Sequence, residues 1–265
     1  MHQTANSKIR LTLLKMVNRG NAAHIGSALS MVEILNAVYR SVEVQKIIHQ
    51  TPDRDRVILS KGHGTSGLYA VMYHHGLLSR QDIDSYFQNG SVMAGHASHF
   101  IENVEHSTGA LGHGLSVGLG TAIGSRSKKF VNRVFVILGD GELHEGSNWE
   151  AIMYAGHQSV GNLCVLVDKN DRSQMGVTSD ACSLDPLADK FSAFGFDCHE
   201  IVDGHEEDEI YETIQSTRSS PKPVAIICNT VKGKGISFME DENIWHYRTP
   251  KDKDFDKAVE ELKVD

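Results

Sequence analysis

The chain has 265 residues, of which 40% are hydrophobic and 23% charged, a composition outside the disordered and membrane-spanning classes. A chain of this length buries enough apolar surface to fold without a stabilising metal ion or disulfide bond. The formal net charge is −8, and no block of lysine or arginine interrupts the sequence. We therefore expect no nucleic-acid partner.

The cysteines and the chain start indicate the compartment. The four cysteines, Cys164, Cys182, Cys198 and Cys228, form no CxxC pair and no Cys/His ligand pattern, which argues against a structural zinc site. Reduced thiols are typical of cytoplasmic proteins. No apolar stretch follows a basic start, and no apolar run approaches the roughly 18 residues that a transmembrane helix needs. We expect a cytoplasmic protein without membrane contact.

The first half of the chain predicts helices around one short strand. Helices are expected over about 8–17, 30–39 and 65–75, with a glycine-rich loop and helix over 109–126 and a buried strand over 57–59. Ser30 is placed to cap the second helix, and Glu33, three residues later, would complete a capping box. The strand ends at the tight loop 60–64.

In the second half, strands and helices alternate. Strands are expected over 134–138, 163–167, 198–202 and 224–228, and helices over 149–157, 187–194, 207–217 and 255–262. The alternation predicts an α/β fold with a doubly wound, mostly parallel sheet and helices on both faces. No repeat or long linker divides the sequence, so a single domain over 1–265 is expected. Such sheets bind ligands beyond the carboxyl ends of their strands.

A candidate metal site follows two of these strands. Asp140 stands in the turn Gly139-Asp140-Gly141-Glu142 after one strand, and Asn170 follows the next strand. If the two strands are neighbours, a carboxylate and an amide oxygen converge there. Mg²⁺ binds one or two such groups and completes its octahedron with phosphates and water. An Asp in a turn and an unrelated Asn in a loop remain the alternative, but the spacing favours a metal and a phosphorylated ligand.

Taken together, these segments resemble the thiamine-diphosphate signature of transketolases. The signature segments are Gly-Asp-Gly-Glu-Leu-His-Glu-Gly at 139–146, Trp-Glu-Ala at 149–151 and Val-Asp-Lys-Asn at 167–170. Further matches follow in the expected order: His-Ile-Gly-Ser at 24–27, Leu-Ser-Lys-Gly-His-Gly at 59–64, Gly-His at 95–96, Ser-Thr-Gly-Ala-Leu-Gly at 107–112 and Lys-Gly-Lys-Gly at 232–235. The resemblance runs from about residue 8 to the end and implies the thiamine-diphosphate-binding fold.

The resemblance covers only one part of a transketolase. It matches the N-terminal, diphosphate-binding domain, and residues 236–265 match the extension that closes over the site. The pyrimidine-binding domain is absent from this sequence. The resemblance therefore implies the N-terminal subunit of a split transketolase. A C-terminal partner subunit would carry the pyrimidine-binding domain, in an α2β2 assembly.

Residue roles follow from the matched positions. The resemblance implies catalytic histidines at His24, His63, His96 and His246. It implies metal ligands at Asp140, Asn170 and the backbone carbonyl of Arg172, with Mg²⁺ as the ion and Ca²⁺ or Mn²⁺ as substitutes. It implies thiamine-diphosphate contacts from His63, Gly109, Leu111, Gly112, Gly139, Asp140, Gly141, Glu142, Asn170 and His246.

The implied reaction moves a two-carbon ketol unit from a ketose or ketose phosphate to an aldose. Imidazoles both donate and accept hydrogen bonds near neutral pH, which suits polyhydroxylated substrates. Lys232 and its neighbours 233–235 either add positive charge near a phosphate or form a flexible surface turn. His113 and His144, where the family has Gln, either line the site or lie outside it.

Three departures from the family pattern leave open which donor and acceptor sugars the protein uses. Residues 23–28 read Ala-His-Ile-Gly-Ser-Ala where many members have Gly-His-Pro-Gly-Gly, His96 lacks the following Pro-Glu, and Tyr247 replaces a glycine after His246. The alternatives are an α-subunit of a 2-oxo acid dehydrogenase, a 1-deoxyxylulose-phosphate synthase and a non-catalytic cofactor-binding regulatory subunit. The segment 142–146 and the retained histidines favour a transketolase.

Overall fold

The computed structural model describes the main chain of residues 4–264. The first half contains α1 (Ala5–Gly20), α2 (Ile25–Leu29), α3 (Val32–Ser41), α4 (Val44–Ile48), β1 (Arg56–Leu59), the 3₁₀ helix η1 (Gly62–Gly64), α5 (Thr65–His74), α6 (Arg80–Ser85) and α7 (Gly114–Ser127). The second half contains β2 (Val134–Gly139), η2 (Gly141–His144), α8 (Gly146–His157), β3 (Leu163–Lys169), α9 (Thr178–Ala181), α10 (Leu187–Ala193), β4 (Asp197–Ile201), α11 (Glu207–Ser216), β5 (Val224–Asn229), η3 (Asn243–His246) and α12 (Asp252–Val264).

The five strands form one parallel sheet in the order β1-β2-β3-β5-β4. Continuous apolar runs such as β2, with all six residues buried, are typical of strands covered on both faces. The register pairs Gly139 with Asp168, so β2 and β3 end side by side. This confirms the predicted sheet and the expected neighbourhood of the two strands.

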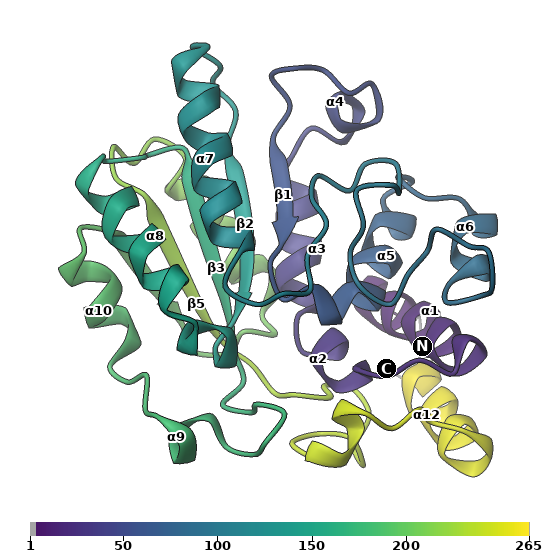
Figure 1. The fold of residues 1–265 in the computed structure, drawn as a ribbon. Coiled ribbons are helices and arrows are strands. Elements are labelled where there is room, and N and C mark those ends of the chain that lie inside the picture. Colours follow the sequence, from purple (N-terminus) through teal and green to yellow (C-terminus); the bar gives the residue numbers. More distant parts are fainter. Residues whose placement is uncertain (1–3, 265) are drawn as a thin grey trace.

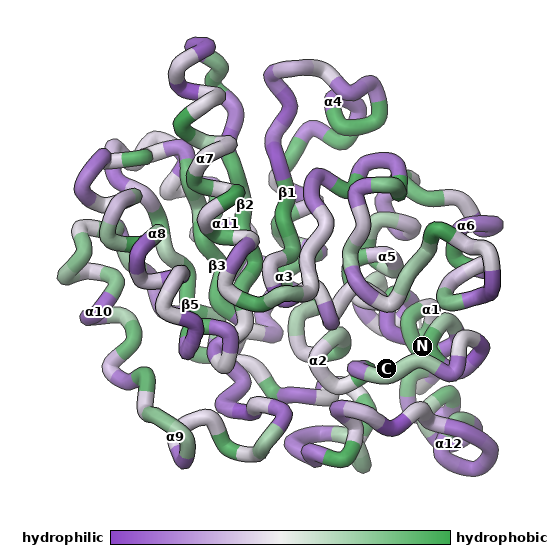
Figure 2. Tube along the Cα trace, viewed as in Figure 1, coloured by the Kyte–Doolittle hydropathy of each residue, from purple (hydrophilic) through white to green (hydrophobic). Residues whose placement is uncertain are grey.

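Helices cover both faces of the sheet (Figure 1). Alternate strand residues, such as Phe135 and Ile137, pack in one apolar cluster with residues of α1, α3, α5 and α11. The others, such as Val134 and Val136, pack in a second cluster with residues of α7, α8 and α10. Figure 2 shows the hydrophobic residues concentrated along the strands between these layers. Within the described chain, no helix is both long and apolar enough to cross a membrane.

The predicted capping box is wrong. Helix α3 begins at Val32, and no side chain caps its N-terminus. Ser30 instead donates a hydrogen bond of 2.6 Å to Asp168, and the Glu33 carboxylate pairs with Arg10 at 2.6 Å. Both side chains are buried, so long-range polar partners in the interior displace the local capping interaction. The short helices α2, α4, α6 and α9 lie outside the predicted elements.

Replacing Phe135 by alanine tests the sheet core. The Phe135 side chain, on the second residue of β2, is fully buried. Its removal leaves a cavity, so we expect Phe135→Ala to lower the free energy of unfolding by about 3–5 kcal/mol. Val131→Ala is the control, since Val131 is 98% exposed and its truncation leaves no cavity. Urea unfolding measures both, and equal effects would contradict this description of the core.

Candidate active site

A cavity of about 390 Å³ lies at the edge where the parallel strands end. It is lined by His24, Ser27, Lys61, His63, His96, Gly109, Leu111, Gly139, Asp140, Gly141, Glu142, His144, Asn170, Arg172, Ser173, Gln174, Met175, Ala181, His246 and Tyr247. The structure thus brings every predicted site residue except Gly112 to one cavity. The loops after β1, β2 and β3 position most of them, as expected for a parallel sheet.

Four histidines form a cluster on one wall. The ring centre of His24 lies 5.4 Å from that of His63, 5.9 Å from that of His96 and 5.1 Å from that of His246. The backbone N–H of His24 donates to the carbonyl of His246 at 2.8 Å, which links the two loops. His24 has a φ of 67°, a left-handed conformation that is rare for non-glycine residues and concentrates at functional sites.

Burial keeps three of these imidazoles neutral. Burial, together with the charges of His96 and Lys232, lowers the pKa of His24 to about 4. Burial and Lys232 lower the pKa of His246 to about 3, and burial and Lys61 hold the pKa of His63 well below its usual value. At neutral pH each of these three rings therefore carries one donor and one acceptor nitrogen.

Asp140 and Asn170 lie where the sequence predicted them. The Asp140 carboxylate accepts hydrogen bonds from the Gly141 N–H at 2.9 Å and from the Thr178 hydroxyl at 3.2 Å. Burial and the negative charge of Asp168 raise its pKa to about 6. The Asn170 side-chain oxygen accepts from the Arg172 N–H at 3.1 Å.

These groups fit a divalent cation. Among the described residues, no basic side chain forms an ion pair with Asp140, although the carboxylate is 3% exposed. Asp140 thus offers a buried carboxylate that is not paired with a basic side chain, and Asn170 offers an amide oxygen in the same cavity. Mg²⁺ prefers oxygen ligands of this kind. The described chain has no cluster of three or more His, Cys, Asp or Glu that could hold a metal by itself. A metal held by Asp140 and Asn170 would therefore need further ligands, such as a backbone carbonyl, a phosphate or water.

Asp168 joins the loops that form the cavity. Its carboxylate is fully buried and accepts hydrogen bonds from Lys61, from Ser30 at 2.6 Å, from Thr230 and from Asn170 at 3.3 Å. Burial alone would raise its pKa, but the Lys61 ammonium dominates and lowers it. The sequence placed Asp168 in a motif without giving it a role.

A second buried cation, Lys232, does not line the cavity itself but contacts two residues that do. Its side chain is 1% exposed, and Nζ lies 2.9 Å from Nδ1 of His246 and 3.2 Å from the carbonyl of Ser173. Burial and the nearby Lys61 lower the pKa of Lys232 to about 8. The interpretation of Lys232 as part of a flexible surface turn is wrong. The available sequence signal for Lys61 and Lys232 is a charged residue shortly after a buried strand. Lys61 follows β1 by two residues, and Lys232 follows β5 by three residues.

Glu142 lines the cavity, whereas Gly112 lies outside its lining, and the two residues are hydrogen-bonded to each other. The Glu142 carboxylate accepts hydrogen bonds from the Ser60 hydroxyl at 2.5 Å, from the Gly112 N–H at 3.0 Å and from the Gly139 N–H at 3.3 Å. Gly112 has a φ of 85°, which favours glycine. The side-chain oxygens of Glu142 are thus occupied by the protein.

His113 and His144 separate in the structure. His144 lines the cavity and bonds to the carbonyl of Cys182 at 2.9 Å. His113 is exposed at the start of α7 and lies outside the cavity lining.

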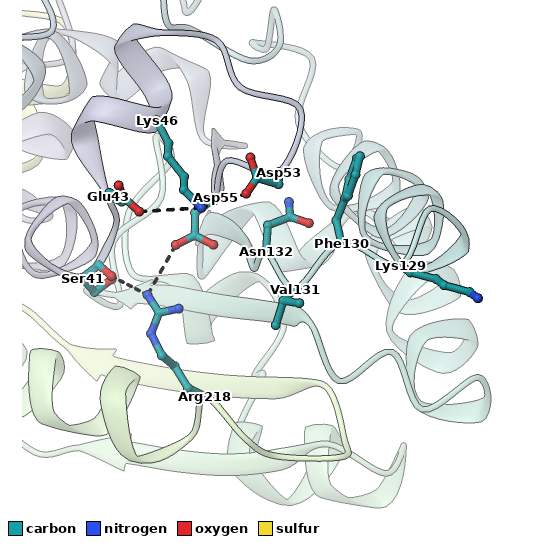
Figure 3. Close-up of a pocket in the computed structure, with 10 residues that line it drawn as sticks. All are labelled: Ser41, Glu43, Lys46, Asp53, Asp55, Lys129, Phe130, Val131, Asn132 and Arg218. Atoms are coloured by element: carbon teal, nitrogen blue, oxygen red, sulfur yellow. Dashed lines mark hydrogen bonds and ion pairs between the residues drawn. The ribbon is translucent and has the colours of Figure 1, made fainter.

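A larger cavity of about 560 Å³ lies at the opposite edge of the sheet (Figure 3). Four of its charged side chains already neutralise one another, since Lys46 pairs with Asp53 at 2.8 Å and Arg218 with Asp55 at 3.4 Å. It holds none of the motif residues. The smaller cavity is therefore the candidate active site.

Asp168→Asn tests the central carboxylate. The change leaves the buried Lys61 ammonium without a counter-charge, so we expect the free energy of unfolding to fall by about 3–5 kcal/mol. Asp84→Asn, which breaks an exposed pair with Arg19, is the control and should have a much smaller effect. Urea unfolding at neutral pH measures both variants. An Asp168→Asn protein as stable as the wild type would refute the proposed dependence of the site on this pair.

Comparison with known proteins agrees with this geometry. The family model described as "Transketolase, thiamine diphosphate binding domain" matches residues 1–265. The chain is 38% identical over 267 residues to an apulose-4-phosphate transketolase subunit of Actinobacillus succinogenes, covering 99% of this chain and 96% of that one. It is 35% identical over 257 residues to the 6-deoxy-6-sulfo-D-fructose transketolase subunit SqwG of a Clostridium species, covering 96% and 93%.

A solved structure shows the same fold. A point mutant of the transketolase of Pichia stipitis in complex with fructose-6-phosphate superposes with a TM-score of 0.90 at 28% identity. The match covers 98% of this chain and 40% of the Pichia chain. By sequence and by structure, this chain belongs to the transketolase family, in which it corresponds to the thiamine diphosphate binding domain.

Proposed function

We propose that this chain is the diphosphate-binding subunit of a two-chain transketolase that uses thiamine diphosphate and Mg²⁺. It would transfer a two-carbon ketol unit from a ketose or ketose phosphate to an aldose. The observation that carries the proposal is the placement of Asp140 and Asn170 at neighbouring strand ends, in one cavity with the four clustered histidines.

The metal and the diphosphate have distinct partners. Asp140, Asn170 and the carbonyl of Arg172 would hold Mg²⁺, for which Ca²⁺ or Mn²⁺ would substitute. The buried Lys232 ammonium, which contacts the lining residues His246 and Ser173, would supply positive potential for a diphosphate. The Lys61 ammonium lines the cavity but is paired with Asp168. When bound, thiamine diphosphate supplies the carbon nucleophile and electron sink for the carbon–carbon cleavage.

The histidines would handle the sugar hydroxyls. His24 is neutral at pH 7, so one ring nitrogen is free to accept the proton that leaves the hydroxyl next to the broken bond. His96, beside it, would hold the donor's hydroxyls. Lys232 donates to Nδ1 of His246, so the proton of that ring lies on Nε2, where it would donate toward the diphosphate and the substrate. His63 packs against the rings of His24 and His246 and would face the diphosphate.

A partner chain would complete the site. The relatives are named as subunits, and this chain spans 40% of the Pichia transketolase. At the rim of the cavity, the lining residues Met175 and Tyr247 expose large apolar side chains to solvent, at 89% and 56%. We propose that a C-terminal subunit with the pyrimidine-binding domain covers this rim in an α2β2 assembly.

The chain itself would act as one cofactor-binding domain over residues 1–265. Its segment 236–265 brings His246 and Tyr247 to the cavity mouth, while α12 packs against α1. The four free cysteines support a cytoplasmic location.

Calorimetric titration with thiamine diphosphate and Mg²⁺ tests this function. We expect binding when the C-terminal partner is present and loss of that binding in Asp140→Ala, because the variant removes the only carboxylate among the proposed metal ligands. Asp180→Ala on α9 is the control, since this exposed carboxylate lies outside the cavity lining. Binding by the Asp140→Ala complex at wild-type affinity would contradict the assignment.

A further inference from the structure

Outside the cavity, the buried residues Arg10 and Glu33 form a polar network with the partly buried His205. The Arg10 guanidinium is 5% exposed and makes two parallel bonds to the Glu33 carboxylate, at 2.6 and 2.7 Å. His205 donates from Nδ1 to the same carboxylate at 3.0 Å. Burial alone would raise the pKa of Glu33, but Arg10 and His205 overcome it and lower the pKa to about 2. The carboxylate therefore stays charged, and these are strong hydrogen bonds.

Both arms of the network end on the segment 231–235. Nε of Arg10 donates to the carbonyl of Lys234 at 3.0 Å. On the other arm, Nε2 of His205 accepts from the Val231 N–H at 2.9 Å. His205 therefore carries its ring proton on Nδ1, the tautomer that Glu33 selects. The network is thus hydrogen-bonded to the segment on both sides of Lys232, at Val231 and at Lys234.

The Arg10 side chain also packs closely against the segment 231–235. Gly235 has a φ of 89°, and a Cβ placed there would lie 2.8 Å from Cδ of Arg10. The Arg10 side chain thus lies directly against the backbone of the segment. Between the two arms, the Gly233 N–H donates to the carbonyl of Gly26 at 3.0 Å, beside the His24 loop.

We propose that Arg10, Glu33 and His205 are positioning residues that fix the segment 231–235 and thereby hold the Lys232 ammonium against His246 and Ser173, two residues that line the cavity. Lys232 projects from this segment to His246 and Ser173. None of the three network residues lines the cavity. Their effect on ligand binding rests on the function proposed above, whereas their effect on the segment does not.

Amide hydrogen exchange of the full chain tests the local part of the proposal. The Glu33→Gln variant loses the negative charge to which Arg10 and His205 are both hydrogen-bonded. We expect peptides covering 229–240 to exchange about tenfold faster, the factor that corresponds to losing one charge-assisted hydrogen bond. Glu105→Gln is the matched control, because Glu105 makes a similar two-bond pair with Arg54, at 2.8 and 3.2 Å, away from this segment.

The second readout is the thiamine-diphosphate affinity of the complex with its C-terminal partner. We expect Glu33→Gln to raise the Kd about tenfold while kcat at saturating cofactor changes by less than about twofold. If the wild-type complex does not bind thiamine diphosphate, the proposed function fails, but the exchange experiment still decides on the network.

His205→Ala provides an independent variant that leaves the pair of Arg10 and Glu33 in place. It frees the Val231 N–H, so the same peptides should exchange faster, and it carries the test if Glu33→Gln does not fold. Unchanged exchange over 229–240, or an increase spread evenly over the chain as in a general loss of stability, would overturn the proposal.

Discussion

The buried ion pair between Lys61 and Asp168 is the interaction on which the rest of the site depends. Two charges removed from water are stable only when they pair and when hydrogen bonds satisfy their remaining atoms. Asp168 meets this condition by accepting from the Ser30, Thr230 and Asn170 side chains as well. Each donor comes from a different part of the chain. One carboxylate thereby joins the turn before α3 and the segments after β1, β3 and β5.

This arrangement also sets the electrostatics of the cavity. Asp168 neutralises Lys61 but adds negative potential at Asp140, which helps to raise the pKa of Asp140. Lys232 has no comparable carboxylate partner in the described chain, and its charge contributes to keeping His24 and His246 neutral. The site therefore combines the Asp140 carboxylate, which suits a cation, with the Lys232 ammonium, which suits an anion and contacts the cavity-lining residues His246 and Ser173. A metal bound to a diphosphate combines those two charges.

The sequence predicted the sheet and most of the cavity lining because both follow from local patterns. Apolar runs such as 134–138 mark buried strands, and parallel strands place Asp140 and Asn170 at one edge. Ser30 and Glu33 were misread because their partners, Asp168 and Arg10, are 138 and 23 residues away. A capping box is a local rule, and a buried charge elsewhere in the fold overrides it. The roles of Lys232 and Asp168 likewise depend on tertiary partners that spacing does not reveal.

The most direct test of the central claim is the position of Mn²⁺ in crystals of this chain with its C-terminal partner and thiamine diphosphate. Anomalous scattering locates the ion without assumptions about its ligands. We expect one Mn²⁺ bound by the Asp140 carboxylate, the Asn170 side-chain oxygen and the Arg172 carbonyl. Mn²⁺ held by other residues, with Asp140 and Asn170 apart from it, would contradict the account.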